Sequence, residues 1–320
     1  MHLHQSLESM PSHVPIALTI GAFDGIHLGH QHLIRQACTA AERLGGESAV
    51  LTFEPHPDRV LHPEQHKLYL TTSQDRAAIL EQLGVDHLIV LRFDRELARV
   101  SAEDFMAALC RAMDLRELWV GPDARLGAGG RGTAPVLRRI GEHLGYSVHE
   151  VGRLQLGDQP VSSTAIRGML AAGAVDEAAR LLGRPFSLSG EVVHGDHRGS
   201  KIGFPTANVD VSGEQVLPAD GVYACRVYLP GSSFGHPAVT NVGVRPTFGL
   251  VRRTVEAHLI GWDGDLYGQV IRVAFLQRLR GEQKFAGIDA LVAQIRADVA
   301  AAHEFLSQSE RESDSSGAPS

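Results

Sequence analysis

The chain has 320 residues, of which 43% are hydrophobic and 21% charged, and its formal net charge is −7. This length favours two domains over one, and the acidic balance argues against a protein that coats nucleic acid or an anionic membrane. The three cysteines, Cys38, Cys110 and Cys225, stand far apart, which indicates reduced thiols in a cytoplasmic protein. The sequence shows neither a signal peptide nor a membrane-spanning apolar run, and it leaves the oligomeric state open.

Strand and helix patterns alternate over the first half of the chain. An apolar run at 16–20 ends in Gly21, and Ser101 with Asp104 three residues later predicts a capped helix start. Strands are expected at 16–20, 48–53, 87–91, 118–120 and 146–151, and helices at 29–44, 73–83, 102–113 and 135–144. This alternation predicts a doubly wound parallel sheet, in which ligands bind beyond the carboxyl ends of the strands. The N-terminus, with His2 and His4, is expected to fray.

The pattern changes near residues 183–185. Short β-rich runs then follow at 190–194, 222–229, 238–242, 254–260 and 270–276. Their spacing predicts a small antiparallel barrel followed by one helix, whose apolar stripe consists of Ile288, Leu291, Val292, Ile295 and Val299. From Ser307 the chain is almost wholly polar and predicts disorder. We therefore expect domains at 1–183 and 184–306, with a disordered tail at 307–320.

The segment FDGIHLGH, Phe23 to His30, lies where the first strand passes into the first helix. The glycines Gly21, Gly25 and Gly29 allow the backbone to approach a ligand, and the helix start offers free N–H groups to phosphate. His27 and His30 could reach one phosphoryl group and, neutral or cationic, donate hydrogen bonds to it. The alternative is a glycine-rich turn with two surface histidines.

A second segment, Ser162-Ser163-Thr164-Ala165-Ile166-Arg167, follows the last strand of this half. Its hydroxyls and helix N–H groups could bind the β and γ phosphates of a nucleotide, and Arg167 could neutralise them. The alternative is an ordinary helix cap with a surface arginine.

These motifs resemble those of the nucleotidyltransferase superfamily. TIGAFDGIHLGHQHL (19–33), LTFEPHP (51–57) and SSTAIR (162–167) are similar to the adenylyltransferase domain of bacterial bifunctional riboflavin kinase/FAD synthetases. The resemblance implies transfer of AMP from ATP to FMN, giving FAD and pyrophosphate. It places His27 and His30 on the α-phosphate, and Ser163, Thr164 and Arg167 on the pyrophosphate. The ATP site would also include Gly21, Phe23, Asp24, Gly29 and Ser162, with Asp24 near the metal or the phosphates.

The chain departs from the family pattern at positions that concern the flavin. Ala22 stands where the family usually has Asn, and the loop 121–133 keeps Asp123 and Arg125, which the resemblance implies are flavin-binding. In that loop two aromatic residues and a lysine of the family are replaced, by Ala124, Leu126 and Ala128 respectively. Each lost ring removes a stacking surface worth about 0.5–1.5 kcal/mol. We predict weaker or altered flavin binding here, with the phosphate chemistry retained.

The second half contains GEVVHGDHRGSKIGFPTAN, which ends at Asn208. Its glycines, including Gly195 and Gly203, form a turn that could wrap phosphates, and Lys201 could neutralise one of them. Thr206 and Asn208 point to the same side of an extended segment and offer oxygen ligands suited to Mg²⁺. The alternative is a β-turn followed by a polar strand.

Further motifs after this segment resemble the riboflavin kinase domain over residues 184–305. They are GVYA (221–224), NVGVRPTFG (241–249), VEAHL (255–259), LYG (266–268) and LRGEQKF (279–285). The resemblance implies a six-stranded barrel that transfers the γ-phosphate of ATP to the ribityl 5′-hydroxyl of riboflavin, leaving ADP. Glu256 is the candidate general base and Arg280 a candidate flavin contact; the alternatives are a barrel-surface carboxylate and a basic barrel rim.

The leading hypothesis is a bifunctional transferase that uses ATP and Mg²⁺ to convert riboflavin to FMN and FMN to FAD. One alternative keeps the kinase but makes the first domain a weak adenylyltransferase, or one that acts on a modified flavin. Another is a non-catalytic flavin-binding regulator, which would have no need of the base and leaving-group residues.

Overall fold

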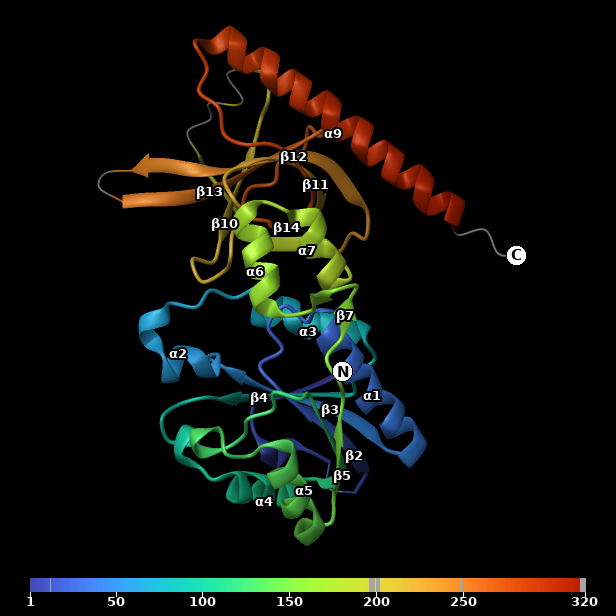
Figure 1. Cartoon of the computed structure of the whole chain (residues 1–320). Coiled ribbons are helices and arrows are strands. Elements are labelled where there is room, and N and C mark those ends of the chain that lie inside the picture. The colour runs from blue at the N-terminus through green and yellow to red at the C-terminus, as the bar shows by residue number, and fades with distance from the viewer. Residues whose placement is uncertain (12, 196–198, 200–201, 248–249, 317–320) are drawn as a thin grey trace. The chain divides into compact units, whose positions relative to one another are not determined.

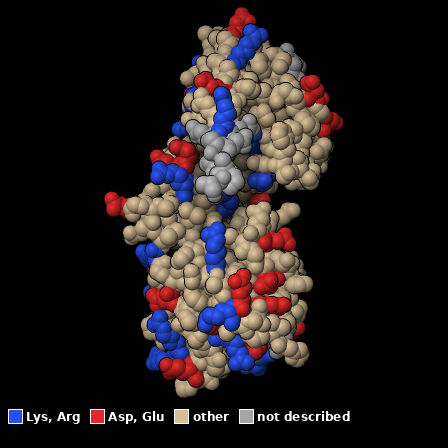
Figure 2. Space-filling model, turned by 90° about the vertical axis from the view of Figure 1, so that its right-hand side faces the viewer, with Lys and Arg blue, Asp and Glu red and all other residues tan. Residues whose placement is uncertain are grey.

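The computed structural model describes residues 1–11, 13–195, 199, 202–247 and 250–316 (Figure 1). Contacts between residues divide the chain into two compact units, Met1–Ser163 and Thr164–Ser320. On the face shown in Figure 2, basic and acidic side chains are interspersed, as expected from the mixed charge of the composition.

The first unit contains a six-stranded sheet with the strand order β1-β4-β3-β2-β5-β6, and every neighbouring pair is parallel. The strands are β1 (His2–His4), β2 (Pro15–Ile20), β3 (Glu47–Glu54), β4 (His87–Arg92), β5 (Asp114–Val120) and β6 (Ser147–Glu150). A separate two-stranded ribbon joins β7 (Gln155–Leu156) to β8 (Gln159–Pro160). The predicted doubly wound parallel sheet is confirmed.

Helices cover both faces of this sheet, as the apolar clusters show. The helices are α1 (Leu28–Leu44), α2 (Pro57–Leu61), α3 (Ser73–Gln82), α4 (Ala102–Ala112) and α5 (Ala134–Leu144), with short 3-10 turns at Leu7–Ser9, Pro63–Gln65, Leu97–Arg99 and Ala128–Gly130. One cluster joins the sheet to Phe105 of α4 and Leu137 of α5, and the other joins it to Ile34 of α1 and Leu80 of α3. Ser101 caps α4 by accepting a hydrogen bond from the backbone N–H of Asp104, as predicted.

The N-terminus, which the sequence predicted to fray, instead forms the edge strand β1 beside β4. His4 is buried, and its two ring nitrogens lie 2.8 Å from Ser9 Oγ and 3.0 Å from His87 Nδ1. The other nitrogen of His87 lies 2.7 Å from Glu47 Oε2. In this hydrogen-bonded chain, His4 and His87 are 83 residues apart and His87 and Glu47 are 40 residues apart, which a local pattern does not reveal.

The second unit is built on a closed barrel with the strand order β10-β13-β12-β11-β14-β9. Its strands are β9 (Phe186–Val193), β10 (Ala207–Val211), β11 (Gly221–Tyr228), β12 (Gly235–Thr247), β13 (Leu250–Leu259) and β14 (Val270–Arg280). All neighbouring pairs are antiparallel. The predicted antiparallel barrel is therefore confirmed, with β10 as a strand absent from the predicted runs.

Two helices precede the barrel, α6 (Ser163–Ala172) and α7 (Val175–Leu182). Contacts assign them to the barrel's unit: the N–H of Ala219 donates to the carbonyl of Leu170, and Arg278 donates to the carbonyl of Ala172. The compact units thus divide after Ser163, whereas the functional boundary at 183/184 stays a prediction.

The last helix is α9 (Ile288–Ser316). Val299 of the predicted stripe and the buried Ala302, both on α9, belong to an apolar cluster with Val222 and Val239 of the barrel. Ile288, by contrast, is 61% exposed. The structure continues this helix beyond Ser307, where the sequence predicted a disordered tail. One contact in that part is local, from the Arg311 guanidinium to the carbonyl of Ser307.

Candidate active sites

The first candidate site begins in the loop after β2, whose backbone is unusual. Phe23, Gly25 and Ile26 have positive φ angles of 48°, 83° and 37°. Such angles are costly for side chains other than glycine and are concentrated at functional sites. A Cβ atom on Gly25 would also come within 2.8 Å of Leu70, so glycine is required there on two grounds.

Asp24 holds this loop to a neighbouring segment. Its buried carboxylate accepts hydrogen bonds from the backbone N–H groups of Leu70, at 2.9 Å, and Thr71, at 3.2 Å. The N–H of Gly25 donates to the Thr71 hydroxyl. Asp24 therefore has an anchoring function, and its position near a metal or phosphates stays a prediction.

His27 and His30 lie together at the start of α1, as the motif predicted. Their rings stack with centroids 3.7 Å apart, and His27 Nδ1 accepts a hydrogen bond from the N–H of His30. Phe23 contacts the His30 ring edge-on. A Cβ on Gly29 would lie 3.2 Å from His27 Nδ1, so a small residue at position 29 leaves room for the stacked pair.

His30 is neutral at ordinary pH. Burial, and next the proximity of His27, lower the pKa of His30 well below its ordinary value. Its Nδ1 atom is buried and has no hydrogen-bond partner among the described residues. Of the two protonation states that the sequence left open, the structure supports the neutral imidazole for His30.

The SSTAIR segment begins at this loop. The Ser163 hydroxyl donates a 2.9 Å hydrogen bond to the carbonyl of Asp24 and so holds the start of the segment to the loop. Thr164 and Arg167 stand on α6 in the second unit. The structure therefore brings Ser163 to the loop that leads to His27 and His30, and the phosphate-binding roles of Thr164 and Arg167 stay predictions.

The loop 121–133 packs against the sheet at the positions that depart from the family. Leu126 is buried in the α4–α5 cluster, where Ala124 packs on it. The N–H of Ala128 donates to the carbonyl of Val100, and a Cβ on Gly127 would come within 2.7 Å of the Ala102 Cα. The side chain of Leu126 thus fills the core instead of lining an open surface.

The two flavin candidates of this loop are exposed. The Asp123 carboxylate pairs with Arg153, whose Nη2 lies 2.5 Å from Oδ1, and the pairing raises the pKa of Arg153. Arg125 donates to the neighbouring carbonyl of Ala124. Neither contact tests a role in flavin binding, which stays a prediction for both residues.

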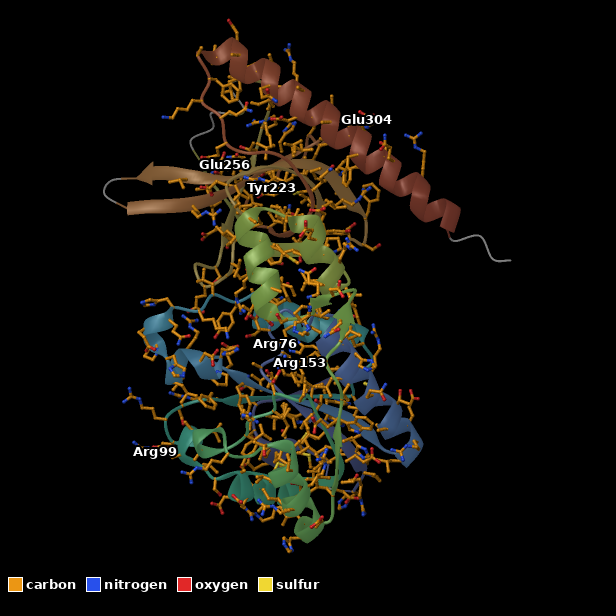
Figure 3. All side chains as sticks on the ribbon, viewed as in Figure 1. Arg76, Arg99, Arg153, Tyr223, Glu256 and Glu304 are labelled. Atoms are coloured by element: carbon orange, nitrogen blue, oxygen red, sulfur yellow. The ribbon has the colours of Figure 1, made fainter. Side chains whose placement is uncertain are left out.

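The second candidate site is a cavity of about 670 Å³ in the barrel unit. Thr206, Glu256 and Arg280, which lie far apart in the sequence, all line it. In the strand register Glu256 faces Asn208 of β10 on one side and Asn241 of β12 on the other. The predicted base and the predicted metal ligands are therefore neighbours, and Figure 3 marks Glu256 on the barrel.

The glycines before β10 pack on the two candidate metal ligands. A Cβ on Gly195 would lie 2.6 Å from Asn208 Cγ, and one on Gly199 would lie 3.4 Å from the Thr206 hydroxyl. Gly203 has a φ of 86°, which favours glycine. Lys201 lies outside the described residues.

A second cavity of about 400 Å³ lies beside the first. Thr206 lines both cavities, whereas Glu256 lines only the larger one. The smaller cavity is lined by the aromatic residues Trp262 and Tyr267 and by two acidic residues, Asp263 and Asp265. Sequence reasoning singled out the segment with Tyr267 but not Trp262.

Arg280 lines the larger cavity but is held by α9. Its guanidinium contacts both carboxylate oxygens of Asp298, with an Nη2–Oδ2 distance of 2.8 Å, and Gln294 donates to the same carboxylate. Both charged side chains are largely buried, at 15% and 6% exposed. Arg280 therefore fixes α9 to the barrel, and its contact with flavin stays a prediction.

Comparison with known proteins gives two family matches in sequence order. The model of the FAD synthetase family matches residues 9–165, and that of the riboflavin kinase family matches residues 182–306. Over the described part of the chain, no helix is both long and apolar enough to cross a membrane.

Several curated relatives match over nearly the whole chain. The bifunctional riboflavin kinase/FMN adenylyltransferase of Escherichia coli K12 is 39% identical over 290 residues, 90% of this chain and 92% of the relative. That of Pseudomonas fluorescens is 38% identical, covering 97% of this chain and 99% of the relative. A solved structure from Streptococcus pneumoniae, described as a macrolide-efflux protein, superposes with a TM-score of 0.86 at 32% identity, covering 94% of this chain and 98% of that one.

Proposed function

The chain belongs to the bifunctional riboflavin kinase/FMN adenylyltransferase family, and we propose that its two reactions take place at the two sites described above. The enzyme phosphorylates riboflavin to FMN with ATP and adenylylates FMN to FAD with release of pyrophosphate. Relatives with both activities align over both domains, so neither the kinase with an altered first domain nor the non-catalytic regulator is favoured.

In the kinase site, the smaller cavity takes the nucleotide and the larger one takes riboflavin. The observation that carries this assignment is that Thr206 lines both cavities while Glu256 lines only the larger. The phosphoryl group passes from the nucleotide to riboflavin, so the residue near the transferred phosphate, Thr206, belongs where the two cavities meet. The general base, Glu256, belongs on the side of the acceptor.

Glu256 removes the proton from the ribityl 5′-hydroxyl as its oxygen attacks the γ-phosphorus, and ADP leaves. Thr206 and Asn208 would supply the protein's ligands to Mg²⁺. A hydroxyl and an amide oxygen fit an ion that takes most of its charge neutralisation from phosphate. When bound, the ion neutralises charge on the transferred group.

In the adenylyltransferase site, a phosphate oxygen of FMN attacks the α-phosphorus of ATP. His27 and the neutral His30 donate hydrogen bonds to the oxygens of that phosphorus, where charge increases in the transition state. The SSTAIR motif assigns Ser163, Thr164 and Arg167 to the departing pyrophosphate, and the hydrogen bond from Ser163 to the carbonyl of Asp24 supports this for Ser163. The unpartnered Nδ1 of His30 supports its assignment to the α-phosphorus.

The replacement Glu256→Gln tests the kinase assignment. General-base loss should lower FMN formation from riboflavin by about 10²–10⁴-fold, while FAD formation from supplied FMN should persist. Kinase turnover equal to that of the wild type would remove Glu256 from the base role.

We place the enzyme in the cytoplasm, where its three free cysteines stay reduced.

A further inference from the structure

A buried arginine of the first unit has no role in the reactions described so far. Arg76 lies on α3 and is only 2% exposed (Figure 3). We propose that Arg76 is a positioning residue for adenylyl transfer, because it fixes the loop that leads to His27 and His30. This proposal rests on the placement of adenylyl transfer at those two histidines.

The guanidinium of Arg76 connects the ends of two strands. Nη1 donates to the carbonyl of Ala22 at 3.0 Å, and Nη2 donates to Glu54 Oε2 at 2.8 Å and to the Ser73 hydroxyl at 3.2 Å. Ala22 follows β2, and Glu54 ends β3, its parallel neighbour. The ligand-binding edge of a parallel sheet lies at these carboxyl ends.

The carbonyl of Ala22 is held immediately before the unusual backbone of the loop. The next residue, Phe23, has a φ of 48°. The Thr52 hydroxyl donates to the same carbonyl at 3.2 Å, so Ala22 accepts two side-chain hydrogen bonds. A backbone in a sparsely populated conformation persists only where its surroundings hold it. At the start of the loop, the hydrogen bonds from Arg76 and Thr52 to the Ala22 carbonyl stabilise this conformation.

Glu54 extends the same network to the middle of the loop. Its carboxylate also accepts hydrogen bonds from Tyr69 and Ser73. Tyr69 directly precedes the segment whose backbone N–H groups bind Asp24. The network around Arg76 therefore fixes the loop at both Ala22 and Asp24. It also gives Glu54, within the LTFEPHP motif, a structural reason to be a carboxylate.

Arg76, Thr52 and Glu54 can affect the rate of adenylyl transfer without touching the substrate, because they hold the loop that positions His27 and His30. Displacement of a reacting group by 1 Å can cost on the order of 10²-fold in rate. Without Arg76 the loop is free to relax, and the rate constant of adenylyl transfer should fall more than FMN binding weakens. A lysine can reach Glu54 or the Ala22 carbonyl but lacks the fork that binds both.

The test uses the full-length enzyme and measures FAD formation from FMN and ATP. Arg76→Gln should lower kcat by about 10–100-fold with the KM for FMN changed less than about threefold, and Arg76→Lys should lie between it and the wild type. Thr52→Val, which removes the second donor to Ala22, should lower kcat in the same direction. FMN formation from riboflavin serves as the internal control and should not change.

The matched control is Arg43→Gln, which removes an ion pair to Glu117 in the same unit without touching the loop. Arg43→Gln should leave kcat for FAD formation unchanged, even if both variants lower the melting temperature. Wild-type kcat in Arg76→Gln, or an equal fall in Arg43→Gln, would overturn the proposal. If Arg76→Gln does not fold, Arg76→Lys and Thr52→Val decide it by the same criterion. Wild-type kcat in His30→Asn would instead refute the placement of the site.

Discussion

Gly195 offers the sharpest test of how the kinase site is built. A Cβ at this position would lie 2.6 Å from Cγ and 2.7 Å from Oδ1 of Asn208. Carbon atoms pack at about 3.5–4.0 Å, so Gly195→Ala must push the Asn208 amide away by about 1 Å. The tip of an asparagine side chain can rotate, so the cost falls on the position of this metal ligand more than on stability.

A displacement of this size should reduce kinase turnover on the order of 10²-fold. The assay incubates the variant with riboflavin, ATP and Mg²⁺ and separates the flavins by chromatography. Gly213→Ala is the matched control, because a Cβ there meets no atom within 4 Å. FAD formation from FMN should be the same in both variants. Wild-type FMN formation by Gly195→Ala would refute the role of Asn208.

Three further predictions follow from individual contacts. Asp298→Asn leaves the largely buried Arg280 without its carboxylate and should cost about 3 kcal/mol, measured by denaturant unfolding; an unchanged midpoint would contradict it. Ser163→Ala removes the hydrogen bond to the Asp24 carbonyl and should slow FAD formation while kinase activity persists; equal slowing of both reactions would argue against it. Because the pKa of His30 is lowered by burial, its contribution to stability is fully present above pH about 6.5 and is lost as the pH falls. The loss of stability on acidification should therefore be smaller in His30→Asn, and an identical pH dependence would count against burial as the cause.

The local patterns of the sequence predicted the fold class well. The alternation of strand and helix patterns indicated the parallel sheet, and the short β-rich runs indicated the barrel. The cap at Ser101 begins α4 as expected. Short elements were not predicted. β1 has only three residues, and its buried side chain, His4, contacts His87, which lies far along the chain.

Site residues were predictable where a motif is local, and their partners were not. His27 and His30 lie close together, as their spacing in the motif suggested, although the stacking of their rings was not predicted. For Arg280, by contrast, the sequence indicated a flavin contact or a basic barrel rim and not the ion pair with Asp298, because Asp298 lies on a different element. Arg76 gave no signal at all, since its burial arises from contacts with two distant segments, Ala22 in the loop after β2 and Glu54 at the end of β3.

The central claim is that one chain carries two independent ATP-using sites, and complementation between variants tests it most directly. Glu256→Gln and His30→Asn are each incubated with riboflavin, ATP and Mg²⁺, first alone and then mixed. Alone, the first should form little flavin nucleotide and the second should accumulate FMN; mixed, they should form FAD, because FMN made by one is adenylylated by the other. Failure of the mixture to form FAD, or wild-type FAD formation by either variant alone, would contradict the account.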